Sequence, residues 1–164
     1  MSHLSRSHAV PAWDREGDLE QARAQVSERV TLHDAEDWGD QFWLVADENP
    51  QTQINKIAGM GPKPVVGSDM VLWTWPPAAL ADLSAAVEEA GGIVVFLEPT
   101  AGLGLRRAAQ IAAGGLFRRT RAHDYRRDIP AELRAAGFIV TTQVRLRNRV
   151  VGDYVRGEAR HFSH

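Results

Sequence analysis

The sequence predicts an α/β fold of three layers, with a Rossmann-like sheet that is mostly parallel and closes with an antiparallel C-terminal hairpin. Its 164 residues, 44% of them hydrophobic, suffice for one core, so we expect a single domain over 1–164. Helical segments alternate with short apolar runs, which is typical of parallel strands joined by helices. Two segments of alternating polarity, 139–146 and 150–160, lie close together in the sequence and predict the hairpin.

The N-terminal part is expected to begin with a helix over 18–28, where apolar residues recur at helical spacing. The β-branched and apolar run 30–32 then predicts a short strand, and the polar cluster 33–37 predicts the loop after it. The apolar run 42–46 predicts a further strand. The stretch 47–68 is rich in Pro and Gly and is expected to be an irregular insertion, mostly loop.

The C-terminal half, 69–164, has clearer boundaries. Residues 70–75 predict a buried strand, and the two prolines that follow suit the first turn of a helix. Residues 93–97 are uninterrupted apolar sequence, as expected of a strand covered on both faces. Further helices are expected over about 103–113 and from Pro130 up to Gly137.

Parallel sheets of this kind bind ligands beyond the carboxyl ends of their strands. With the strands placed as above, this rule singles out Asp34, the segment Trp73 to Trp75, and the pair Glu98-Pro99.

Three parts of the chain resemble the class I S-adenosylmethionine-dependent methyltransferases, both in the order of the segments and in their local sequence. They are WDREGDLEQARAQVSERVTLHDAED at 13–37, SDMVLWTWPPAALADLSAAVEEAGGIVVFLEP at 68–99, and IPAELRAAGFIVTTQVRL with VGDYVRGEARH at 129–146 and 151–161. They look like the family's second to third strands, its fourth to fifth strands, and its last helix with the terminal hairpin.

The resemblance implies a cofactor site within 13–46 that would hold the ribose and adenine of S-adenosylmethionine. Asp14 matches the acid that binds the ribose, and Asp34 with Ala35 matches the pair that contacts the adenine. A carboxylate can accept hydrogen bonds from ribose hydroxyls or from an exocyclic amine. Trp73 is a further candidate for lining this pocket. The structural alternatives are a helix-start residue for Asp14, a turn residue for Asp34 and a core position for Trp73.

One departure from the family pattern matters for function. The family's glycine-rich turn precedes the ribose acid, whereas the residues before Asp14 include no glycine. We therefore expect a fold that is truncated or rearranged at its N-terminus and that lacks the family's first strand. The run 42–46 could fill the gap this leaves, in the sheet or at its edge. A second chain, in a homodimer, could fill it instead.

The charge is spread unevenly along the chain. Residues 1–50 hold 11 acidic and 4 basic side chains, a net of −7, whereas 101–164 hold 5 acidic and 13 basic ones, a net of +8. Such asymmetry is found in nucleic-acid-binding proteins. The arginines alternate with apolar residues, which favours the alternative that the two halves neutralise each other in one fold.

The remaining chemical signals are few. The chain has no cysteine and no HExxH pair, so we expect no metal site. His123, in the connector 116–128, is a candidate proton acceptor for methyl transfer, against the alternative of a solvated histidine. No run approaches the ~18 apolar residues of a membrane span, and the first residues carry no secretory signal, so the expected location is the cytoplasm.

The sequence therefore predicts methyl transfer from S-adenosylmethionine to an unknown small-molecule acceptor, if the protein is active. Two alternatives stay open. One is a non-catalytic remnant of the fold that acts as a binding or dimerisation module, and the other is an Arg-rich protein associated with nucleic acid.

Overall fold

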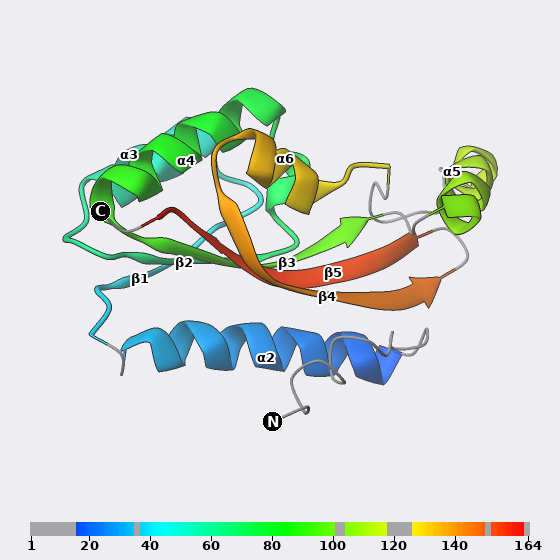
Figure 1. The fold of residues 1–164 in the computed structure, drawn as a ribbon, viewed down its shortest axis with the longest axis horizontal. Helices are drawn as coiled ribbons and strands as arrows, with labels where there is room; N and C mark the ends of the chain where they lie inside the picture. The colour runs from blue at the N-terminus through cyan, green and yellow to red at the C-terminus, as the bar shows by residue number, and fades with distance from the viewer. Residues whose placement is uncertain (1–15, 35–36, 101–103, 118–125, 150–151, 163–164) are drawn as a thin grey trace.

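The computed structural model describes residues 16–34, 37–100, 104–117, 126–149 and 152–162 (Figure 1). Along the chain the elements are α2 (Glu16–Asp34), β1 (Gln41–Trp43), α3 (Pro50–Ala58), β2 (Val65–Asp69), the 3-10 helix η1 (Leu72–Thr74), α4 (Pro77–Ala90), β3 (Ile93–Thr100), α5 (Gly104–Phe117), α6 (Ile129–Ala135), β4 (Ile139–Arg149) and β5 (Gly152–Arg160).

The strands form one mixed sheet in the order β1-β2-β3-β5-β4. The pairs β1–β2 and β2–β3 are parallel, whereas β5 runs antiparallel to both β3 and β4. Helix α2 covers one face of the sheet, and α3, α4 and α6 cover the other (Figure 1). The predicted three-layer α/β fold with a C-terminal antiparallel hairpin is confirmed.

Strand β3 lies at the centre of the core, and its side chains are buried along its whole length. Val94 and Phe96 pack into the cluster beneath α3, α4 and α6, while Val95 and Leu97 pack into the cluster that α2 covers. Burial on both faces explains the uninterrupted apolar sequence that predicted this strand.

Helix α4 begins where the sequence predicts. Pro77 occupies its first turn, where the missing N–H has no helical partner to lose. Gly91 ends it with a φ of +70°, a left-handed conformation that a residue with a Cβ rarely adopts.

The strand predicted at 30–32 is wrong, because α2 continues to Asp34. Val30 is fully buried and extends the stripe of Ala22 and Val26 at a spacing of four residues, so helical packing against the sheet decides this segment.

The prediction that 47–68 is mostly loop is also wrong. This segment contains α3 and most of β2, and the strand expected at 70–75 is placed instead at 65–69. Met70 has a φ of +59° and turns the chain out of β2 into η1. The apolar run at 42–46 does supply a strand, β1, which lies at the edge of the sheet beside β2.

Candidate functional site

The carboxyl ends of β1, β2 and β3 lie at one edge of the sheet because these strands are parallel. Three segments follow them there: the loop after β1, η1 after β2, and the end of β3 at Thr100. This edge, which we call the carboxyl edge, is where ligands bind in sheets of this type.

Glu98 is the buried centre of the carboxyl edge. Its Oε2 accepts a hydrogen bond from Ser68 Oγ at 2.6 Å, and its Oε1 accepts one from the Trp73 N–H at 2.9 Å. Complete burial raises the pKa of Glu98 to about 8, and the hydrogen bonds from Ser68 and the backbone offset part of that rise. Glu98 therefore ties the ends of β2 and β3 to η1.

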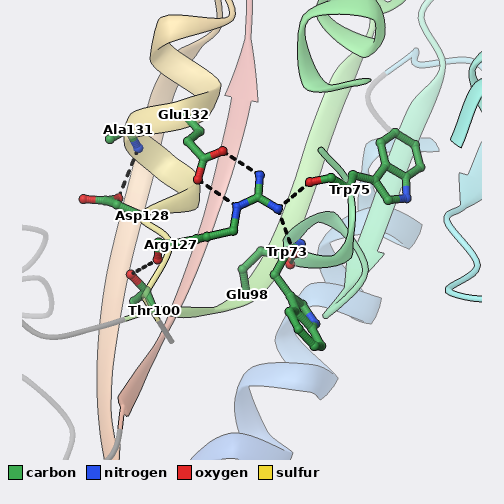
Figure 2. Close-up of polar contacts among 8 residues, drawn as sticks. All are labelled: Trp73, Trp75, Glu98, Thr100, Arg127, Asp128, Ala131 and Glu132. Carbon is green, nitrogen blue, oxygen red and sulfur yellow. Dashed lines mark hydrogen bonds and ion pairs between the residues drawn. The ribbon is translucent and has the colours of Figure 1, made fainter. Parts of the chain in front are cut away.

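Arg127 fixes η1 from the other side (Figure 2). Its guanidinium makes a bidentate ion pair with Glu132 of α6, with Nε–Oε2 and Nη2–Oε1 distances of 3.0 and 2.5 Å. Its Nη1 donates to the backbone carbonyls of Trp73, at 2.7 Å, and Trp75. The backbone carbonyl of Arg127 accepts from Thr100 Oγ1 at 3.1 Å. Arg127 thus links α6 and η1 through its side chain and the end of β3 through its backbone.

A fully buried amide, Gln53 of α3, holds the loop that follows β1. Its Nε2 donates to the carbonyls of Val45 and Glu48 at 2.8 and 3.0 Å, and its Oε1 accepts from the Val45 N–H at 2.8 Å. Asn49 Oδ1 caps the start of α3 by accepting from two backbone N–H groups. The loop is therefore fastened by the chain's own side chains and has no glycine between Trp43 and Asn49.

Trp73, the remaining predicted cofactor residue within the described part of the chain besides Asp34, lies at the carboxyl edge. It lies in η1 rather than in a strand, is half-buried, and packs against both core clusters. Asp69, the last residue of β2, lies nearby in the sequence and keeps 44% of its side chain exposed while it pairs with Arg23 Nε at 3.3 Å. Asp69 was not among the site residues predicted from the sequence.

Asp34 lies at the opposite edge. Helix α2 runs against the direction of β1–β3: Arg23 reaches Asp69 at the end of β2, whereas His33 contacts Glu158, which is paired with Val95 near the start of β3. Asp34 ends this helix, so its predicted position after a strand is wrong. Its role in adenine binding stays a prediction. Asp14, Ala35 and His123 lie outside the described residues.

Several arginines of the basic C-terminal part make contacts within the fold. Arg127 pairs with Glu132, and Arg134 donates to Gln143 Oε1 at 2.9 Å. Arg29, from the acidic N-terminal part, pairs with Glu158 at 2.7 Å. These contacts are of the kind expected if charges are matched inside one fold.

Among the described residues, no cluster of three or more His, Asp or Glu side chains has the arrangement of a metal site. In the same part of the chain, no helix combines the length and apolar character that crossing a bilayer requires.

No family model and no curated protein matches this sequence. Among solved structures, the chain is similar to the pyocyanin biosynthetic protein PhzM at 17% identity and a TM-score of 0.47, over 65% of this chain. It spans 33% of PhzM, about a third of that protein's length. It is also similar to magnesium protoporphyrin IX methyltransferase (ChlM) from Synechocystis PCC 6803 with bound SAH, at 18% identity and a TM-score of 0.48, over 96% of this chain and 92% of that one.

Proposed function

We propose that this chain is a methyltransferase-like protein that binds S-adenosylmethionine at the carboxyl edge and transfers its methyl group to a small-molecule acceptor. The observation that carries the proposal is that Asp69 ends β2 and Trp73 lies in η1 directly after it, at the edge where three parallel strands finish. The resemblance of segments 68–99, 129–146 and 151–161 to the class I methyltransferases agrees with it.

The residues present suit the adenosine part of the cofactor. The half-buried indole of Trp73 offers an aromatic surface for adenine, and the half-exposed carboxylate of Asp69 can accept hydrogen bonds from ribose hydroxyls. When bound, the cofactor supplies an activated methyl group on its sulfonium. The chain then needs to align donor and acceptor and to exclude water. Asp14 and Ala35 remain proposed cofactor residues, and His123 remains a proposed proton acceptor. Asp34, at the opposite edge, is not within reach of a cofactor bound at the carboxyl edge.

A second candidate, a non-catalytic binding module with the same fold, is favoured by the loop after β1. Gln53 fastens this loop, and Asn49 already accepts the backbone N–H groups of Gln51 and Thr52 at the start of α3. Those amides are therefore not free to bind the carboxylate of the cofactor's methionine part.

Calorimetric titration of the full chain with S-adenosylmethionine and with S-adenosylhomocysteine separates the two. We expect saturable heat with both ligands, and about tenfold weaker binding for Trp73→Ala, since base–aromatic stacking contributes roughly 1–3 kcal/mol. Trp38→Ala, at the opposite edge of the sheet, is the matched control. If no heat appears at about 1 mM ligand, where even a 4 kcal/mol interaction is half-saturated, the methyltransferase proposal fails and the binding module remains.

A further inference from the structure

A pocket lies at the edge where the parallel strands begin, opposite the carboxyl edge. It has a volume of about 180 Å³ and is formed by the end of α4, the residues that end β5, and the segments that lead into β1 and β2. The lining side chains that bear on its chemistry are those of Trp38, Lys63, Glu88, Arg160, His161 and Phe162. We call it the amino-edge pocket.

The backbone around this pocket is fixed on both sides of Lys63. Its N–H donates to the carbonyl of Ala90, and its carbonyl accepts from the N–H of Gly39, both at 2.7 Å. A Cβ at Gly39 would lie 2.1 Å from the Pro62 carbonyl oxygen, so two chain segments pass in contact there. The pocket wall is therefore preformed.

Lys63 itself has a φ of +54°, in the left-handed region that a lysine rarely adopts. This conformation accompanies a side chain whose Nζ lies 5.8 Å from the centroid of the Trp38 ring. A strained residue held by its surroundings is a frequent feature of ligand sites, and here it presents a cation above an aromatic surface.

The two permanent cations of the pocket, Lys63 and Arg160, have no polar side-chain partner among the described residues. His161 is 10% exposed and shares its Nε2 between Ser84 Oγ at 2.8 Å and Glu88 Oε2 at 3.9 Å. Burial lowers the pKa of His161, which favours its neutral form, so Glu88 balances only one of the two permanent cations.

We propose that the amino-edge pocket binds a small aromatic carboxylate. The carboxylate pairs with Lys63 and with the guanidinium of Arg160, whose planar donors match its geometry. The ring lies against Trp38, and Phe162, which is 80% exposed at the rim, gains cover when the ligand is bound. A volume of about 180 Å³ corresponds to roughly six water molecules and admits a single-ring molecule.

This proposal is independent of the proposed methyl-donor site. The two sites share no residue and lie at opposite ends of the parallel strands, so either can fail while the other stands.

The test is calorimetric titration of the full chain with benzoate, with benzamide as the uncharged isostere and acetate as the anion without a ring. We expect benzoate to bind with a Kd below about 1 mM and each of the other two at least about tenfold more weakly, because each lacks one of the two contacts. The proposal is overturned if benzoate gives no saturable heat up to about 10 mM, or if benzamide or acetate binds as tightly as benzoate.

Variants test the assigned residues with the same titration. Arg160→Gln and Lys63→Met should each weaken benzoate binding by about tenfold, since each removes one charge-assisted contact. Arg134→Gln, an arginine of the same chain whose side chain lies outside the pocket, is the matched control and should leave the affinity unchanged. Thermal melting of each variant checks that it is folded. Equal affinity of folded Arg160→Gln and the unmodified chain would contradict the assignment.

Discussion

Replacing the buried carboxyl of Glu98 by the amide of glutamine should make the fold less sensitive to a rise in pH than that of the unmodified chain. Because the pKa of Glu98 is raised from 4.5 to about 8, the folded chain keeps this group protonated at a pH where the unfolded chain ionises it. The stability it contributes is fully present below about pH 4.5 and is lost as the pH rises through about 8. Glutamine resembles the protonated form: its Oε1 accepts from the Trp73 N–H, and its Nε2 faces Ser68 Oγ, which reverses the hydrogen bond that Ser68 donates to the carboxylate.

The magnitude follows from proton linkage. Between about pH 5.5 and 7.5 the unfolded state binds one proton fewer than the folded state, so the free energy of unfolding falls by roughly 1.4 kcal/mol per pH unit, or about 3 kcal/mol in all. Glu98→Gln removes this dependence. Denaturant unfolding of both proteins at the two pH values measures the difference directly.

Glu20→Gln is the matched control, because its side chain is 76% exposed and paired only with Arg23 at 3.9 Å among the described contacts. It should leave the pH dependence of unfolding as in the unmodified chain. If Glu98→Gln retains the same pH dependence, the carboxyl is ionised in the fold, and our account of Glu98 as a protonated link between β2, β3 and η1 is wrong.

Three further substitutions test the contacts that shape the carboxyl edge. Arg127→Met should lower the free energy of unfolding by about 2–4 kcal/mol, because it leaves Glu132 and the carbonyls of η1 without their donor; urea unfolding measures this. Gln53→Leu should cost about 1–3 kcal/mol by leaving polar groups of the loop after β1 unpaired, and faster hydrogen exchange at the Val45 amide should accompany it. Gly67→Ala should cost about 1–3 kcal/mol, because its Cβ would lie 2.6 Å from the Trp43 ring; a smaller cost in a Trp43→Ala background, measured as a double-mutant cycle, would support the steric cause.

The elements that could be predicted from the sequence are those whose residue pattern fits only one type of secondary structure. Residues 93–97 are apolar throughout because β3 is covered on both faces, and α4 carries a proline at its start and a left-handed glycine at its end. The hairpin was predictable because the segments that form β4 and β5 are close in sequence and alternate in polarity.

The prediction errors lie where a tertiary contact, and not the local sequence pattern, determines the secondary structure. Val30 suits a strand by propensity, but its spacing from Val26 places it on the buried stripe of α2. Strand β2 contains a glycine and a serine, residues typical of loops, and is a strand because Gly67 leaves room for the Trp43 ring and Ser68 bonds to Glu98. The misplaced strand at 30–32 in turn moved Asp34 to the wrong edge.

The residues of the candidate site likewise divide into those that the sequence predicts and those that it does not. The rule about carboxyl ends of strands found Glu98 and Trp73 even though the strand before Trp73 was misplaced, since an error of a few residues leaves that edge unchanged. Arg127 was one arginine among many in a basic connector. Its bond to Glu132, five residues along the chain, depends on where α6 begins. Gln53 was missed because the helix that carries it was not predicted.

The two edges of the sheet differ in how their polar groups are used, and this difference bears on what each can bind. Glu98 is buried and Arg127 is only 20% exposed, and their hydrogen bonds go to the chain itself. A ligand that displaced them would leave polar groups unpaired at a cost of about 1–3 kcal/mol each. The Asp69–Arg23 pair is half-exposed and worth at most about 1 kcal/mol, so a ligand hydroxyl can replace or share it at little cost.

Substitutions at these two kinds of residue should therefore separate stability from binding. Asp69→Asn keeps an oxygen acceptor but removes the charge, so it should weaken S-adenosylmethionine binding by a few-fold and leave the unfolding midpoint nearly unchanged. Glu98→Gln should move the unfolding midpoint and leave ligand affinity unchanged, because its carboxyl is 0% exposed and reaches no ligand. If instead Asp69→Asn unfolds the chain and Glu98→Gln abolishes binding, then the buried network, and not the exposed rim of β2, is the binding surface.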